Sequence, residues 1–202
     1  MDGKLSGLGA GEFAERLASR EATPGGGGAS ALCGALGAAL GAMAARLSER
    51  TPEDGLAPLI DRFDTLRLRL LALIDEDAEG FRPLAAAYAI PKDAPGRAET
   101  LRDATLRALE APMEMLRRCA ETVERLEELL PKCKKLLLSD LGCAAALAEG
   151  ALRSAALNVY VNTRTLPPEL RAPLEQEAEG LVREFSPRAA ALYAEVEREL
   201  KK

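Results

Sequence analysis

The fold of this chain is decided by residues 23–48, TPGGGGASALCGALGAALGAMAARLS. The stretch opens with consecutive glycines, Gly25 to Gly28, and then carries no charged residue until Arg46. Its large side chains recur at spacings of three and four residues, which is the period of one face of an α-helix. They are Leu32, Leu36, Leu40, Met43 and Leu47. The pattern predicts a glycine loop that leads into an apolar helix over residues 29–48.

The glycine loop has two interpretations, and the sequence leaves both open. Glycine has no Cβ, so the backbone can approach a ligand closely, and the free N–H groups of the following helix attract an anion or a carboxylate. In the alternative, the loop is flexible and precedes a tightly packed core helix. Gly34, Gly37 and Gly41 give that helix a smooth face on which another helix can pack at short range. We interpret this face as the contact between two subunits of a homodimer.

Length and composition bound the class of protein. A chain of 202 residues suits one domain, so we treat residues 1–202 as a single helical domain. The net charge of −5 and the aromatic content of 3% argue against nucleic-acid binding, which needs concentrated positive charge and stacking surfaces. The core must be built from leucine and alanine, which favours helices.

The complete absence of histidine excludes several kinds of site. A Ser-His-Asp or Cys-His device cannot operate, and histidine cannot hold a metal ion. Proton transfer near neutral pH must therefore use carboxylates, lysine, tyrosine, cysteine or water.

The cysteines lack the close pairs that are typical of a zinc site. They are Cys33, Cys119, Cys133 and Cys143. Residues 1–10 have no apolar core of the kind found in a secretory signal, so we expect a cytoplasmic protein with free thiols. Residues 29–45 are apolar but shorter than the roughly 20 residues of a membrane span, so we expect no membrane insertion.

Helical periodicity continues along the chain and is interrupted by proline and glycine. We expect helices over residues 11–19, 29–48, 58–88, 97–130 and 139–163, and a last helix from residue 168 to the C-terminus. Pro83 and Pro112 should kink their helices, and Pro187 is a candidate break in the last one. No segment has the pattern of a β-strand. The predicted fold class is all-α, an antiparallel bundle of about five or six long helices.

One carboxylate lies on the apolar face of the third expected helix. That face is formed by Leu59, Phe63, Leu66, Leu70, Ile74, Asp77 and Phe81. A carboxylate there costs free energy unless it is paired, hydrated or protonated, and burial raises its pKa toward the range of a general acid or base. In the alternative, Asp77 is a structural group that is hydrogen-bonded to a neighbouring helix. Asp75 faces another side and is expected to be solvated, and its acidic neighbours Glu76 and Glu79 are a weak metal signal without histidine.

Two amides on the fifth expected helix form a second candidate site. Asn158 and Asn162 lie one turn apart, so their side chains can reach one ligand. They indicate recognition of a polar heterocycle, or else hydrogen bonds between helices. Asp140 lies 18 residues before Asn158, which is about 27 Å in an unbroken helix. If both sets of residues act, the ligand is long, two subunits contribute, or one set is structural.

A series of short segments, taken in order, resembles the cyclodeaminase/cyclohydrolase family of one-carbon folate metabolism. The family includes the cyclodeaminase part of formiminotransferase-cyclodeaminase and bacterial methenyltetrahydrofolate cyclohydrolases. The segments are FAERL at 13–17, TPGGG at 23–27, the small-residue helix with Met43, DAEGF at 77–81, IPK at 90–92, SDL at 139–141 and NVYVN at 158–162. The chain departs from the family at Cys133 and Lys134, where a Gly-Asn pair is usual.

The resemblance implies an all-helical homodimer that binds a reduced folate near the glycine loop and needs no metal or redox cofactor. It implies catalytic roles for Asp77, Ser139 and Asp140. The substrate-binding roles fall on Pro24, Gly25, Gly26, Gly27, Ser30, Lys92, Asn158 and Asn162.

The expected function is that of a formiminotetrahydrofolate cyclodeaminase, which closes 5-formiminotetrahydrofolate to 5,10-methenyltetrahydrofolate and releases ammonia, or of the related methenyltetrahydrofolate cyclohydrolase. The sequence does not separate these two activities. The altered Cys133-Lys134 segment keeps a further alternative open, which is an inactive helical dimer of the same family that binds folate or a protein partner. Neither a nucleic acid nor a membrane is expected as a partner.

Overall fold

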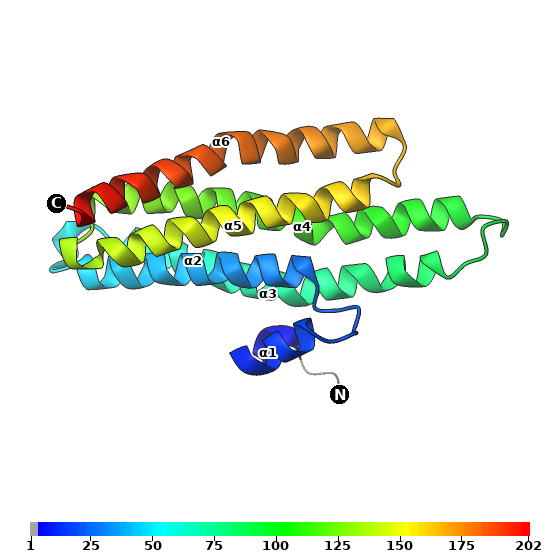
Figure 1. The fold of residues 1–202 in the computed structure, drawn as a ribbon, viewed down its shortest axis with the longest axis horizontal. Coiled ribbons are helices and arrows are strands. Elements are labelled where there is room, and N and C mark those ends of the chain that lie inside the picture. Colours follow the sequence, from blue (N-terminus) through cyan, green and yellow to red (C-terminus); the bar gives the residue numbers. More distant parts are fainter. Residues whose placement is uncertain (1–3) are drawn as a thin grey trace.

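The computed structural model describes residues 4–202, and this part of the chain is helical apart from its connections (Figure 1). Five long helices form an antiparallel bundle, which confirms the predicted fold class. The α-helices are α1 (Ala10–Leu17), α2 (Gly26–Ser48), α3 (Ala57–Tyr88), α4 (Arg97–Leu129), α5 (Leu138–Thr163) and α6 (Pro168–Leu200). Short 3-10 helices lie at Leu5–Gly7, Pro52–Asp54, Leu130–Lys132 and Lys135–Leu137.

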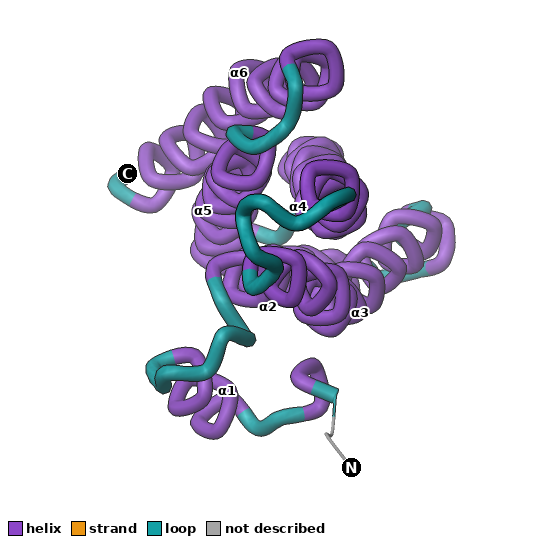
Figure 2. The backbone as a smooth tube through the Cα atoms, turned by 90° about the vertical axis from the view of Figure 1, so that its right-hand side faces the viewer, coloured by secondary structure: helices purple, strands orange, loops and turns teal. Residues whose placement is uncertain are grey.

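Helix α2 contacts three of the other long helices. It packs against α3 and α5, with a smaller contact to α4, and α4 in turn contacts both α3 and α5. The end-on view in Figure 2 shows α6 beyond α5 and α1 below α2, outside the bundle. Helix α1 is attached through Phe13, which is buried and lies beside Gly28 at the start of α2.

The start of α2 differs from the predicted one. The helix begins at Gly26, so Gly26, Gly27 and Gly28 form its first turn and only Gly25 precedes it. The prediction of a four-glycine loop is wrong because glycine carries no side chain from which a helical period can be read. The backbone N–H groups of these glycines nevertheless lie at a helix N-terminus, where they favour negative charge.

The smooth face of α2 lies inside the monomer. A side-chain carbon on Gly37 would lie 3.1 Å from the backbone oxygen of Ala144 on α5, and one on Gly34 would lie 3.0 Å from the sulfur of Cys119 on α4. The interpretation of this face as a subunit contact is therefore wrong. The larger residues of α2 lie on the opposite side, where Leu36 and Leu47 are about half-exposed.

The prolines do not interrupt the long helices. Helix α3 continues through Pro83, α4 through Pro112 and α6 through Pro173 and Pro187. The candidate break at Pro187 is therefore not present. A proline removes only one backbone donor, and the remaining hydrogen bonds and the packing hold each helix together.

Helix α2 is also long and apolar enough to cross a membrane, with 23 residues and a mean hydropathy of 1.5. The helix is therefore longer than the apolar stretch of residues 29–45 that the sequence indicated. However, 61% of its most apolar window is buried inside the protein, as in the core helix of a bundle.

Candidate functional site

A small cavity opens at the N-terminus of α2. It has a volume of about 170 Å³, and its walls come from the segment before α2 and from helices α2, α3, α4 and α5. The lining residues are Ala22, Thr23, Gly25, Gly26, Gly27, Asp77, Phe81, Ala108, Asn158, Val161 and Asn162. The cavity thus brings together three groups that were predicted separately from the sequence: the glycines, the α3 carboxylate and the α5 amides.

The carboxylate of Asp77 lies directly against the first turn of α2. A side-chain carbon at Gly27 would overlap the carboxylate, so this close approach requires glycine. Desolvation raises the pKa of Asp77 to about 6, and a hydrogen bond from the Gly28 backbone N–H opposes this with a smaller effect. A carboxylate with this pKa can both accept and donate a proton near neutral pH.

The two asparagines face the same cavity from α5. The Asn158 amide donates to the backbone oxygen of Ser154, and the Asn162 amide donates to that of Asn158, both at 2.9 Å. These bonds lie within α5 and do not join helices, so they use the amide N–H₂ groups and leave the side-chain oxygens as acceptors. The Asn158 Oδ1 faces Gly26, 3.2 Å from the position of a side-chain carbon there. The pair is suited to ligand groups that donate N–H bonds.

Several predicted site residues do not line the cavity. Pro24 is buried behind Gly28, and the Ser30 hydroxyl donates to the backbone oxygen of Gly26 at 2.6 Å within α2. Both support the first turn of α2 from outside the cavity. Lys92 is exposed on the connection between α3 and α4.

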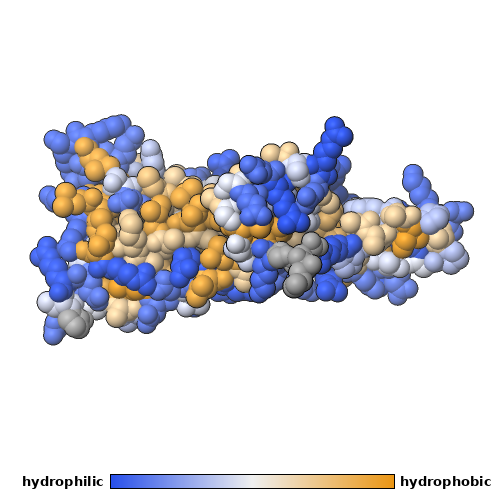
Figure 3. All heavy atoms as spheres, turned by 90° about the horizontal axis from the view of Figure 1, so that it is seen from below, coloured by the Kyte–Doolittle hydropathy of each residue, from blue (hydrophilic) through white to orange (hydrophobic). Residues whose placement is uncertain are grey.

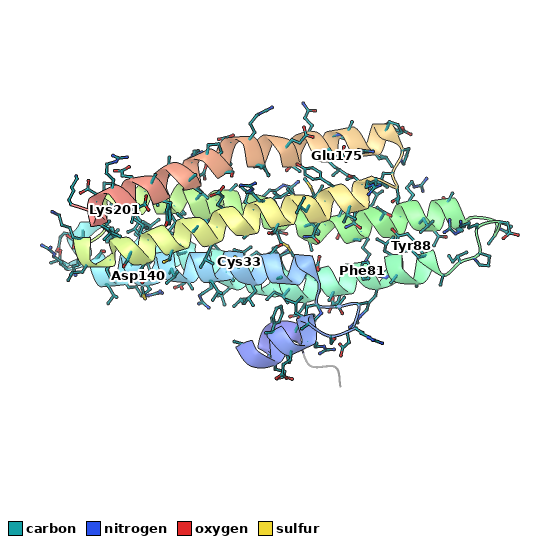
Figure 4. All side chains as sticks on the ribbon, viewed as in Figure 1. Cys33, Phe81, Tyr88, Asp140, Glu175 and Lys201 are labelled. Atoms are coloured by element: carbon teal, nitrogen blue, oxygen red, sulfur yellow. The ribbon has the colours of Figure 1, made fainter. Side chains whose placement is uncertain are left out.

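Ser139 and Asp140 lie in the first turn of α5, at the opposite end of that helix from the asparagines. Figure 4 shows Asp140 at one end of the bundle, far from the labelled Phe81. Because α5 is unbroken between Asp140 and Asn158, the expected separation is confirmed, and these two residues do not join Asp77 within one chain. Their catalytic roles stay a prediction from the resemblance.

Other cavity residues were not predicted as site residues. Phe81 follows Asp77 by one turn of α3, and Val161 lies between the two asparagines on α5. Their helical spacing from the predicted residues could have identified them as cavity residues. Ala108 comes from α4 and has no such signal, because only the packing of α4 against α3 brings it to the cavity.

The acidic neighbours of Asp77 have structural roles. The backbone N–H and the hydroxyl of Ser6 donate to Asp75 at 3.3 and 2.5 Å, so Asp75 faces another side than Asp77 but is half-buried and bonded rather than fully solvated. Glu76 pairs with Arg69 on the same helix. Within residues 4–202, no group of three or more histidine, cysteine, aspartate or glutamate residues is arranged to hold a metal ion.

An all-helical bundle with a desolvated carboxylate and two amides around a helix N-terminus defines a small-molecule enzyme site without histidine. The family model of formiminotransferase-cyclodeaminase matches residues 9–179. A methenyltetrahydrofolate cyclohydrolase from Methylorubrum extorquens is 35% identical over 91% of this chain and 93% of its own length. The chain belongs to the formiminotransferase-cyclodeaminase family.

Two further relatives agree with this assignment. The formimidoyltransferase-cyclodeaminase of Sus scrofa is 28% identical over 92% of this chain, which spans 36% of the pig protein. The crystal structure of formiminotetrahydrofolate cyclodeaminase from Thermotoga maritima matches with a TM-score of 0.81 and 26% identity, and the match covers 98% of both chains.

Proposed function

We propose that this protein is a methenyltetrahydrofolate cyclohydrolase with its catalytic centre at Asp77. The desolvated Asp77 carboxylate beside the first turn of α2 is the observation that carries the proposal. The methenyltetrahydrofolate cyclohydrolase relative, aligned over nearly the full length of both chains, supports the choice of substrate. The substrate carries a delocalised positive charge on its methenyl group, which a nearby carboxylate stabilises.

The reaction adds water to the methenyl carbon and opens the ring. Asp77 accepts a proton from water as its oxygen bonds to the methenyl carbon, which gives a neutral hydroxyl adduct. The carbon–N5 bond then breaks, N5 takes up one proton, and the hydroxyl proton leaves to form the formyl group on N10. Overall, the cation and water become 10-formyltetrahydrofolate and one released proton. Asn158 and Asn162 orient the pterin ring through their free amide oxygens.

The second candidate is the cyclodeaminase activity, which the likeness to the Thermotoga maritima enzyme favours. In this reaction the formimino group of 5-formiminotetrahydrofolate reacts in its protonated form. N10 attacks the formimino carbon, and the carbon–nitrogen bond to the departing ammonia breaks, so that the positive charge stays on the methenyl product. Asp77 carries the proton from N10 to the leaving nitrogen. The same carboxylate and the same amides serve both reactions, and neither assigns a step to a metal ion or a redox cofactor.

The proposal includes a homodimer, in which two copies of the chain contact each other through the outer face of α2 and not through its smooth face. Leu36 and Leu47 are exposed on this face, with Leu32, Leu40 and Met43 partly exposed between them. Figure 3 shows hydrophobic residues gathered on the side of the molecule that is seen from below, where α2 lies. Such a patch is typical of a subunit interface.

The test follows the ultraviolet absorbance band of methenyltetrahydrofolate with purified protein. Enzyme-dependent loss of the band is expected from methenyltetrahydrofolate and establishes the cyclohydrolase. Appearance of the band from 5-formiminotetrahydrofolate, with release of ammonia, establishes the cyclodeaminase instead. If a folded protein changes neither substrate, the alternative of an inactive family member is correct.

A further inference from the structure

The cavity at Asp77 is too small for a whole folate. Pockets that enclose drug-sized ligands have volumes of about 300–1,000 Å³, whereas this cavity has about 170 Å³. It can hold the reacting part of the pterin, but the p-aminobenzoylglutamate part must lie outside. The surface around the cavity must therefore provide a second binding region for the p-aminobenzoylglutamate part.

A second, larger groove adjoins the cavity across α5. It has a volume of about 540 Å³, lies between the end of α5 and the start of α6, and shares Val161 with the cavity. Its remaining lining residues are Leu157, Tyr160, Arg164, Arg171, Glu175 and Glu179. Asn158 and Asn162 point to the cavity side of this turn, whereas Leu157 and Arg164 belong to the groove, so Val161 marks the boundary between the two.

The surface at this boundary is apolar. Leu157 is 67% exposed and Val161 is 59% exposed, although both are large hydrophobic residues. Tyr160 adds an aromatic ring from the same turn of the helix. This surface is suited to a flat apolar group that lies across α5.

The groove also contains one cation that no carboxylate neutralises. Arg171 pairs with Glu175 at 2.8 Å, and Glu175 also accepts a hydrogen bond from Thr163 at 2.6 Å. Arg164 lines the groove, and its side chain forms neither a hydrogen bond nor an ion pair with any residue between 4 and 202. Its guanidinium is therefore available to a ligand carboxylate, which it can bind through two parallel hydrogen bonds.

We propose that the α5–α6 groove binds the p-aminobenzoylglutamate part of the folate, with the ring over Leu157 and Val161 and a glutamate carboxylate on Arg164. This assignment rests on the proposed function of the Asp77 cavity. The ligand must cross α5, a distance of about 10 Å, and the rigid p-aminobenzoyl group separates the pterin from the glutamate by a comparable distance. Glu179 lies on the far wall of the groove and opposes the ligand charge.

The experiment compares 5,10-methenyltetrahydrofolate with 5,10-methenyltetrahydropteroate, which lacks the glutamate. Arg164→Ala is expected to raise KM for the folate about fivefold, since an exposed ion pair contributes about 1 kcal/mol, and to leave kcat and the KM for the pteroate unchanged. Glu179→Gln is expected to lower KM for the folate. Arg153→Ala is the matched control, because Arg153 is exposed on α5 and lines neither the cavity nor the groove.

An unchanged KM for the folate in Arg164→Ala would overturn the proposal, as would an equal rise with both substrates. A rise in Lys92→Ala instead would place the glutamate toward the α3–α4 connection. If the wild-type protein turns over neither of these two substrates, the proposed function fails separately. Calorimetric titration with methenyltetrahydrofolate then makes the same comparison by affinity, and no difference between wild type and Arg164→Ala excludes the groove.

Discussion

Burial of the Asp77 carboxylate lowers the stability of the folded protein. This carboxylate is desolvated among Phe81, Ala108 and the α2 glycines, and the one hydrogen bond from Gly28 only partly compensates. A carboxylate placed for stability would have a full set of donors and a lowered pKa. The raised pKa of Asp77 is therefore typical of a functional group rather than of a structural one.

Replacement of Asp77 by asparagine should stabilise the protein at neutral pH. Below the ordinary pKa of 3.8 the carboxyl is neutral in both the folded and the unfolded state, and above the folded-state pKa of about 6 it is charged in both. Between these values the folded state binds the proton more tightly, so wild-type stability falls as the pH rises. The free energy of unfolding of Asp77→Asn should exceed that of wild type by at most about 3 kcal/mol above pH 6.

Urea unfolding of both proteins at pH 4 and pH 7 measures this difference. The gain of Asp77→Asn should be small at pH 4 and largest at pH 7. A variant that is less stable than wild type at pH 7 would show that Asp77 has a structural role.

The same substitution should abolish turnover. Removal of a general base costs about 10²–10⁴ in kcat, and asparagine cannot take up a proton. In wild type, kcat/KM should fall as the pH drops below about 6, where Asp77 becomes protonated. Blank-corrected rates between pH 5 and 8 test the profile. Near-normal activity of Asp77→Asn, or a profile without this limb, would remove Asp77 from the mechanism.

The sequence predicted this carboxylate and the two amides. Asp77 interrupts an apolar stripe, and Asn158 and Asn162 interrupt another, so each is visible as a polar exception. Ser30 and Lys92 were assigned by resemblance, and neither lines the cavity in the structure. A serine that bonds to its own helix and a lysine on a distant connection have no sequence pattern that separates them from ligand-binding residues.

The first turn of α2 determines how closely α3 can approach. The absence of a side chain at Gly27 lets the Asp77 carboxylate lie against the helix N-terminus. A larger residue at position 27 would displace the Asp77 carboxylate from the Gly28 N–H, so the arrangement of the cavity depends on glycine at this position.

Gly27→Ala should therefore impair catalysis through Asp77. The added carbon overlaps the carboxylate, so we expect kcat to fall at least tenfold and stability to fall by about 1–3 kcal/mol. The stability loss should disappear when Asp77→Ala is added, because that change removes the overlapping atoms. Gly180→Ala on α6 is the control, since nothing lies within 4 Å of the added carbon. Equal activity of Gly27→Ala and wild type would contradict the arrangement.

The helices themselves could be read from the sequence to within a few residues, except at the glycines. Apolar spacing located α3, α4 and α5, because each buries one stripe of large side chains. It could not show which side of α2 faces the core, because small residues give close helix packing whereas large ones normally mark the buried side. Gly37 and its alanine neighbours are buried, and Leu36 is exposed.

The predicted site residues lie at two ends of one bundle. Asp77 and the asparagines surround the start of α2, while Ser139 and Asp140 lie near its end. One chain cannot bring the two ends together. An antiparallel dimer would bring one end of each chain toward the opposite end of its partner, and this is a reason to determine the oligomeric state.

The outer face of α2 should hold that dimer together. Light scattering of the wild type should give about twice the monomer mass of 21.5 kDa. The double variant Leu36→Glu/Leu47→Glu should scatter as a monomer, because an interface cannot bury two unpaired charges without a large cost in free energy. Tyr193→Glu on α6 is the control, since Tyr193 is 46% exposed and α6 packs against α5 and α4 rather than against α2. A monomeric wild type would contradict the dimer, and a double variant that stays dimeric would place the contact on another face.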